Sequence, residues 1–267
     1  NTPPLPEDKV VSTCASIAQS DARNHPERAQ RTAEMIEASG PLTPLFDIAE
    51  AEVGKFLATT PPPRRWVLDD FLPLGITATI ISPGGVGKSQ FLMQLAYSVA
   101  TGLSLCGRWP VGEEGSVLML CAEDAEEEIH RRVNRIHRQL GQALGPAISN
   151  KLVSRLFVRS VIGEDMLLTR ATGHRSELSR TRIADRLAMT AQQLSDVKLI
   201  ILDPGSRFRG GDENSNDDGT RFVQALEHIG KLTGATILVA HHSGKGALNT
   251  KTGPSQNDSR GASALTD

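Results

Sequence analysis

The sequence predicts an α/β fold, in which a mostly parallel, twisted sheet is flanked by helices and preceded by an N-terminal helical and linker extension. Three observations predict it. Short apolar runs alternate with amphipathic helical segments from residue 66 onward, a glycine-rich stretch joins the first run to the first helix, and residues 1–64 lack this alternation. Apolar runs separated by helices are typical of a parallel sheet covered on both faces.

The apolar runs have the length of strands, and the segments between them have the length of helices. Strands are predicted at Ile76–Ser82, Ser116–Cys121, Leu156–Val161, Lys198–Leu202 and Ala235–Ala240. Helices are predicted at Lys88–Thr101, Ala125–Leu140, Arg180–Leu194 and Asp218–Leu232. Because ligands of such sheets bind at the carboxyl ends of the strands, we expect the functional residues to collect there.

Residues 1–64 are predicted to form an extension outside the main domain, which occupies residues 65–267. Residues 27–38 have the pattern of a short helix, and residues 59–65, TTPPPRR, are typical of a stiff linker. Since the chain begins with Asn1 rather than Met, we expect its natural N-terminus to lie further upstream.

Composition limits the partners and the compartment. The formal net charge is −2 and the pI is near 6.4, so any nucleic acid must bind at a local basic site. Cys14, Cys106 and Cys121 have no metal-ligand spacing and form no even disulfide set, which indicates a reducing compartment. No apolar run approaches ~20 residues, so we expect a cytoplasmic protein without a membrane span.

The stretch SPGGVGKSQ, residues 82–90, joins the first strand to the first helix and predicts a phosphate site. Glycines let a loop wrap closely enough to point backbone N–H groups at phosphates, and the following helix adds its positive N-terminal end. The pattern G-x-x-x-x-G-K-[ST] is met except at its first position, Ser82. An ordinary glycine-rich turn is the alternative, and the strand–loop–helix context disfavours it. The predicted nucleotide-binding residues are Gly84, Gly85, Val86, Gly87, Lys88, Ser89 and Gln90.

Three residues would supply the contacts to ATP and Mg²⁺. Lys88 would reach the β- and γ-phosphates, and the Ser89 hydroxyl would bind Mg²⁺. Asp203 ends the apolar run in KLIILDP and would hold the water shell of the metal. An Asp at a strand end is often only a turn or cap residue, but its combination with Lys88 favours the metal role.

Hydrolysis also needs a group that orients or deprotonates the attacking water. Pro204 follows Asp203, so the candidate is Glu123, at the strand tip in LMLCAED. The alternative is that this acidic stretch only decorates a helix N-terminus, where acids are favoured. We assign that simpler role to residues 126–128, expect Asp124 to be the N-cap, and predict a catalytic role for Glu123.

The last apolar run, in TILVAHHSGKG, ends in His241 and His242. A polar pair at a strand tip can hydrogen-bond the γ-phosphate and relay its presence to the next loop. The alternative is that one or both are satisfied interior histidines. His242 is the preferred sensor because it lies further out along the strand.

Two polar, glycine-rich loops follow the strand tips, at residues 207–219 and 243–263, and their length indicates function or disorder. Cations on such loops suit contacts with the phosphates of single-stranded DNA. Acids are mixed among them, however, and charge count alone favours solvated loops without a special role. The candidate DNA-binding residues are Arg207, Arg209, Lys245, Lys251 and Arg260.

The order of these motifs resembles RecA-like P-loop ATPases, and in particular the RepA-type group of hexameric replicative DNA helicases. The resemblance spans residues 61–267. It is carried by PPPRRWVLDDFLPLGITATIISPGGVGKS, by AEDAEEEIHRRVNRI, and by HHSGKG followed by SRGAS. It implies the same roles at Lys88, Ser89, Glu123, Asp203 and His242.

The resemblance has further implications for partners. The two loops would line the central channel of a hexamer and grip single-stranded DNA. Arg132 falls where the family has an arginine near the catalytic site, although a helix-surface arginine fits the sequence nearly as well. The family's subunit-bridging arginine would lie just beyond Asp267, so we expect the last strands of the domain to lie outside this chain.

The predicted function is therefore an ATP-driven motor, a hexameric replicative helicase that translocates on single-stranded DNA. One alternative is a RecA-like ATP-dependent DNA-binding or recombination accessory protein that does not unwind DNA. Another is a nucleotide switch that binds a protein partner. Residues 1–60 match no part of the family and could be a remnant of a primase or an oligomerisation arm.

Overall fold

The computed structural model describes residues 23, 25–27, 44–141, 145–171, 178–212 and 215–242. The chain divides into two units, Asn1–Pro62 and Pro63–Asp267. The first unit contains a 3-10 turn η1 (Ile48–Ala51) and a short helix α3 (Gly54–Leu57). Apart from Glu27, the helix predicted at residues 27–38 lies outside the described residues.

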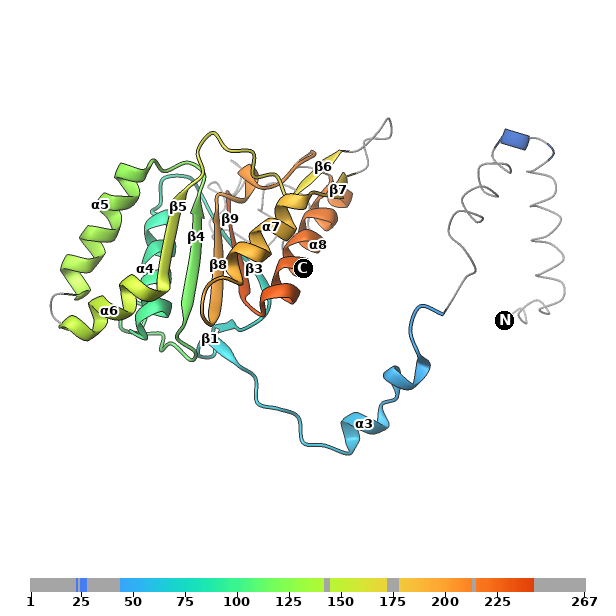
Figure 1. The fold of residues 1–267 in the computed structure, drawn as a ribbon, viewed down its shortest axis with the longest axis horizontal. Helices are drawn as coiled ribbons and strands as arrows, with labels where there is room; N and C mark the ends of the chain where they lie inside the picture. The colour runs from blue at the N-terminus through green and yellow to red at the C-terminus, as the bar shows by residue number, and fades with distance from the viewer. Residues whose placement is uncertain are drawn as a thin grey trace, which may run out of the picture. The chain divides into compact units, whose positions relative to one another are not determined.

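The second unit is built on a five-stranded parallel sheet with the order β3-β9-β8-β4-β5 (Figure 1). Its strands are β3 (Thr77–Ser82), β4 (Ser116–Cys121), β5 (Leu156–Ser160), β8 (Val197–Asp203) and β9 (Thr236–His242). All five predicted strands are present. Because β8 and β9 run slightly further than predicted, Asp203 and both histidines belong to the strands themselves.

Helices cover both faces of the sheet, as Figure 1 shows. On one face lie α4 (Lys88–Thr101), α5 (Glu126–Ile136) and α6 (Pro146–Arg155), and on the other lie α7 (Arg182–Ala191) and α8 (Asn216–Thr233). A π-helical turn, η2 (His137–Gly141), extends α5. The prediction of a mostly parallel sheet flanked by helices is confirmed.

The central strands divide their side chains between two apolar clusters. In β4, Met119 packs with the α4–α6 side, whereas Leu118 and Leu120 pack with the α7–α8 side. Strand β8 repeats the pattern, with Ile201 on the first side and Ile200 on the second. Successive strand side chains point to opposite faces, so these continuous apolar runs form two cores at once.

Several small elements were not predicted. They are α6 and two antiparallel hairpins, β1 (Trp66–Leu68) with β2 (Leu72–Pro73) and β6 (Thr169–Ala171) with β7 (Leu178–Arg180). Helix α6 buries only Leu152, so its sequence has a weak helical period. The hairpin strands are two or three residues long, which is too short for a pattern of alternation.

Within the described residues, each helix is too short or too polar to span a lipid bilayer.

Candidate active site

The glycine-rich loop leaves β3 at Ser82 and enters α4 at Lys88. Gly85 and Gly87 have φ angles of 80° and 89°, a left-handed conformation that other residues rarely adopt. A Cβ atom at either position would meet no neighbour within 4 Å, so the backbone conformation, rather than a lack of space, favours glycine. The loop therefore turns sharply while leaving its outer side open.

Helix α4 presents its N-terminus to this open side. Gly87 is its N-cap and, as a glycine, supplies no side-chain cap to that end. The first N–H groups of a helix lack partners within the helix, and the helix dipole adds positive charge to them. The N-terminus of α4 can therefore bind an anion such as a phosphate.

Parallel pairing brings the ends of the other strands to the same edge of the sheet. Ser82 of β3 lies beside His242 of β9, and Cys121 of β4 lies beside Asp203 of β8. Glu123 follows two residues after Cys121. The distant sequence motifs therefore meet because the carboxyl ends of parallel strands share one edge.

A cleft of about 450 Å³ lies at this edge. The predicted site residues that line it are Gly85, Gly87, Lys88, Ser89, Gln90, Glu123, Asp203 and His242. Gly84 and Val86 are exposed parts of the same loop but do not line the cleft. The cleft has the size of a small-ligand site.

Lys88 crosses from α4 to the edge of the sheet. Its side chain is nearly buried, at 8% exposure, and its Nζ donates a hydrogen bond to the carbonyl oxygen of His241 at 2.9 Å. Nζ also lies 3.2 Å from Nδ1 of His242. Burial lowers the pKa of Lys88, while the negative charges of Asp203 and Glu123 act in the opposite direction.

Asp203 is 4% exposed, and burial raises the pKa of its carboxyl group. A hydrogen bond with Ser89 and the positive charge of Lys88 oppose this increase. The Ser89 hydroxyl and the Asp203 carboxylate thus lie together, and both are hard oxygen donors of the kind that Mg²⁺ prefers. These two residues fit the predicted metal site.

The prediction that Asp124 caps α5 is wrong. The N-cap is Ala125, which makes no side-chain cap, whereas Asp124 accepts two hydrogen bonds from Arg132, at 2.6 and 3.0 Å. Glu128 accepts a third from Nε of Arg132, at 3.0 Å. The reason is that the guanidinium of Arg132, about two turns along the helix, donates to both carboxylate oxygens of Asp124.

These contacts place Arg132 at the cleft, together with Asp124, Glu128 and Arg135. Burial raises the pKa of Asp124 more than the Arg132 guanidinium lowers it. The resemblance placed Arg132 near the catalytic site, but no residue pattern was used to predict its pairing with Asp124 and Glu128. The available signal was the Glu128–Arg132 spacing of four residues, which brings two side chains together on a helix.

The two histidines differ in burial. His241 is buried and offers its backbone carbonyl to Lys88, which fits the interior alternative considered for this pair. His242 is half-buried, lines the cleft and is the last residue of β9. Of the two, His242 has the position expected of a γ-phosphate sensor.

The predicted DNA-binding residues are only partly described. Arg207 is exposed at the end of η3 (Gly205–Arg207). Arg209 is 7% exposed, and its guanidinium donates to the backbone oxygens of Asp212 and Ser215, so it holds the loop together rather than facing solvent. The other three, Lys245, Lys251 and Arg260, lie outside the described residues.

A family model described as an AAA domain matches residues 43–247, which include the whole sheet and every residue that lines the cleft. The chain belongs to this AAA-domain family. The predicted P-loop ATPase class is confirmed at the level of this domain.

Two solved structures resemble the AAA domain. One is described as the ATPase domain of G40P, with 10% identity, a TM-score of 0.46, and coverage of 71% of this chain and 65% of that one. The other is described as a DnaB-like replicative helicase and its interactions with primase, with 11% identity, a TM-score of 0.46, and coverage of 92% and 60%. The chain therefore spans less than two thirds of either structure.

Proposed function

We propose that this AAA domain hydrolyses ATP with Mg²⁺ as part of a hexameric replicative helicase that moves along single-stranded DNA. One observation carries the proposal: a glycine-rich loop, a buried lysine and the acidic groups at the ends of two adjacent strands surround a single cleft. This is the set of groups that phosphoryl transfer requires, since its catalysis consists mainly of positioning and charge stabilisation.

The triphosphate would lie along residues 84–90, with its anionic oxygens at the N-terminus of α4. Lys88 would exchange its hydrogen bond to the neutral carbonyl of His241 for one to a charged phosphate oxygen. A charge-assisted hydrogen bond is stronger than one to a neutral acceptor, so this exchange favours binding. A nearby phosphate would also favour the protonated state of Lys88, which burial of this side chain disfavours.

Ser89 and Asp203 would hold Mg²⁺ near the β- and γ-phosphates. When bound, the ion neutralises negative charge that develops on the phosphate oxygens. Glu123 is exposed to the cleft and would orient the attacking water. The water oxygen bonds to the γ-phosphorus, the bond from that phosphorus to the bridging oxygen of ADP breaks, and Glu123 accepts the proton of the water.

His242 would link the phosphate to movement. It contacts the cleft and Lys88, and the chain continues directly from it into the second predicted loop, residues 243–263. Loss of the γ-phosphate changes the hydrogen bonds available to His242, and this change would shift the loop. Arg207, Lys245, Lys251 and Arg260 are the DNA contacts that we assign to the two loops.

The test is to measure the native mass and the ATPase rate of the full chain, with and without single-stranded DNA, and then the unwinding of a forked duplex. We expect a hexamer, stimulation of hydrolysis by DNA, and ATP-dependent strand separation. Stimulation without unwinding would support the non-unwinding DNA-binding alternative instead. Hydrolysis that does not respond to DNA would support a nucleotide switch.

A further inference from the structure

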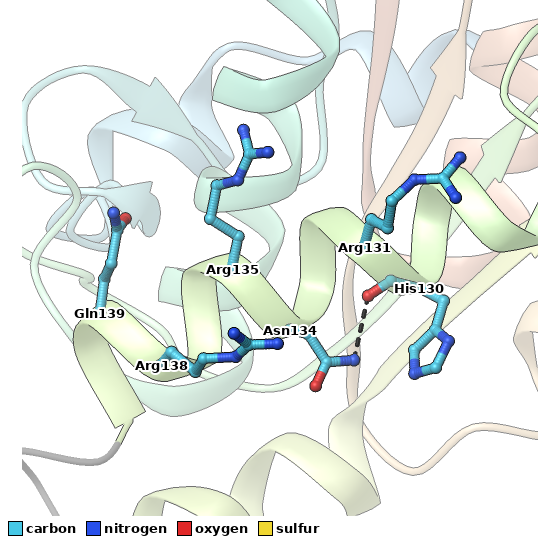
Figure 2. A pocket seen from close by; sticks show the side chains of 6 residues that line it. All are labelled: His130, Arg131, Asn134, Arg135, Arg138 and Gln139. Carbon is cyan, nitrogen blue, oxygen red and sulfur yellow. Dashed lines mark hydrogen bonds between the residues drawn. The ribbon is translucent and has the colours of Figure 1, made fainter.

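A second groove of about 600 Å³ runs along the exposed side of α5 and the η2 turn (Figure 2). All of its lining side chains are polar. They are His130, Arg131, Asn134, Arg135, Arg138 and Gln139. We call this surface the arginine groove. Neither the ATP site nor the two predicted loops require it.

The arginine groove carries positive charge that its surroundings neutralise only in part. Residues 130–139 contain four arginines and two histidines but no acidic residue. Arg131 pairs with Glu128 at 2.8 Å. Arg135 and Arg138 are exposed, and neither has an ion-pair partner within the described part of the domain. On a chain with a formal net charge of −2, this is a local basic site.

The side chains form two rows along the helix. His130, Asn134 and Arg138 are spaced by four residues, as are Arg131, Arg135 and Gln139. Because an α-helix rises 1.5 Å per residue, members of a row lie about 6 Å apart along its axis. Figure 2 shows Arg131 and Arg135 pointing to one side and His130 and Asn134 to the other. The donors are thus repeated along a line rather than gathered at a point.

The end of the groove is held by a contact with the core. The helix changes to π-helical geometry at His137, whose Nδ1 lies 3.2 Å from the hydroxyl of buried Tyr97. Arg138 and Gln139 belong to this turn. Single π-helical turns occur frequently at functional sites, where they alter the direction of side chains.

We infer that the arginine groove binds the sugar–phosphate backbone of a nucleic acid. Arginine donates two parallel hydrogen bonds to a phosphate group, and the repeated donors match a repeating polyanion. A protein partner is disfavoured because protein interfaces have an apolar or aromatic centre, and the lining of this groove has none. The lining has no Phe, Tyr or Trp, the side chains on which bases stack most strongly, so we expect binding to depend little on base sequence.

The groove also adjoins the ATP cleft. Arg135 lines both, and its neighbour Arg132 lines the cleft alone. Nucleic acid bound in the groove and a nucleotide phosphate bound in the cleft would therefore both contact α5. This inference goes beyond the proposed motor, because binding at the groove needs neither ATP turnover nor unwinding.

The experiment measures the binding of a labelled 30-nucleotide single-stranded DNA of mixed sequence by fluorescence anisotropy. The measurements are made without ATP and over a range of salt concentrations. The variant is Arg131→Gln with Arg138→Gln, which spares Arg135 because that residue also lines the ATP cleft. The matched control is Arg182→Gln with Arg186→Gln. It removes the same charge from exposed positions of α7, on the opposite face of the sheet.

We expect the groove variant to bind the oligomer severalfold more weakly, and the slope of log K against log salt to fall by about 1.4, or about 0.7 for each lost phosphate contact. The α7 control should match the wild type, and both variants should keep the wild-type Tm and DNA-free ATPase rate. Equal affinity and equal salt slope in the groove variant and the wild type would overturn the inference.

Other outcomes separate this inference from the proposed function. Groove-dependent binding by a protein that never unwinds DNA would leave the groove assignment standing and reject the helicase. DNA-stimulated unwinding that the groove variant performs as the wild type does, with unchanged affinity, would reject the groove alone. If the groove variant bound poly-glutamate more weakly than the wild type but bound DNA equally well, the result would point to an acidic protein partner and would also overturn the inference.

Discussion

The ammonium group of Lys88 is hydrogen-bonded to the carbonyl oxygen of His241 at 2.9 Å and lies 3.2 Å from Nδ1 of His242. One cation thus joins the start of α4 to the end of β9. A bound γ-phosphate must compete for the same ammonium group, so nucleotide binding and the surroundings of His242 are physically linked.

Lys88→Ala should abolish ATP turnover, because it removes the only cation that reaches the cleft from the phosphate-binding loop itself. A steady-state phosphate-release assay measures this. Lys231→Ala, on the exposed face of α8, is the matched control and should hydrolyse ATP at the wild-type rate. Normal turnover by Lys88→Ala would show that the site is assigned incorrectly.

Glu123→Gln should bind ATP with nearly wild-type affinity and hydrolyse it about 10²–10⁴-fold more slowly, because an amide can orient water but cannot accept its proton. Binding is followed with a fluorescent ATP analogue and turnover by phosphate release. Glu127→Gln removes an exposed acid that does not line the cleft and should leave both quantities unchanged. Wild-type turnover by Glu123→Gln would assign the base elsewhere.

His242→Ala should keep ATP binding and lose most of the stimulation of kcat by single-stranded DNA. His242 contacts Lys88 and precedes the loop that we assign to DNA. Its removal should therefore uncouple ATP binding from the stimulation of kcat by DNA. Rates measured with and without DNA test this. If stimulation were intact in the variant, His242 would not be the sensor.

Arg132→Gln should reduce kcat by more than about tenfold, because this guanidinium lies at the cleft, where it can stabilise negative charge on the phosphates. Asp124→Asn should reduce kcat through the same residue, because Asp124 holds the Arg132 guanidinium at 2.6 and 3.0 Å. The double variant should therefore be no slower than Arg132→Gln alone. Additive losses of activation free energy would indicate that Asp124 acts independently.

Glu113→Gln should destabilise the domain at neutral pH but not at low pH. Hydrogen bonds from Arg65 and Lys198 lower the pKa of Glu113 from 4.5 to about 2. The folded state therefore binds fewer protons than the unfolded state between these values. The stabilisation is complete above pH 4.5 and disappears as the pH falls towards 2.

We expect a loss of about 1–2 kcal/mol at pH 7, after allowance for partial solvent exposure, or a fall in Tm of about 2–8 °C. Thermal unfolding of wild type and variant from pH 7 down to 3 measures the difference. Glu164→Gln, which breaks an exposed pair with Arg159, should change Tm by less than about 2 °C. A constant difference between Glu113→Gln and wild type across this range would refute the pairing.

The sheet and the position of the glycine-rich loop at the cleft could be predicted because their signals are local. Five apolar runs and the sequence SPGGVGKS are visible within short windows, and parallel topology then requires that Asp203 and Glu123 meet Lys88. The contact between Asp124 and Arg132 could not be predicted in this way. It depends on the local backbone conformation at the start of α5, where Ala125 rather than Asp124 is the N-cap, and no residue pattern signals this choice.

Arg209 illustrates a second limit of the sequence. A polar, glycine-rich loop suggested solvent-facing cations, yet the loop folds on itself and surrounds this guanidinium with backbone carbonyls. The arginine groove was missed for the opposite reason. Its residues were interpreted only as part of an amphipathic helix. The spacing of the groove side chains also fits the ordinary exposed face of such a helix, so the spacing alone did not indicate a groove.

The most direct test is a crystal structure of the protein with Mg²⁺ and a non-hydrolysable ATP analogue. The triphosphate should wrap around the N-terminus of α4, with Lys88 on the β- and γ-phosphates and with Glu123 and Asp203 on either side of the γ-phosphate. Binding of the triphosphate in the arginine groove instead, or a γ-phosphate beyond reach of both acids, would contradict the proposed ATPase site.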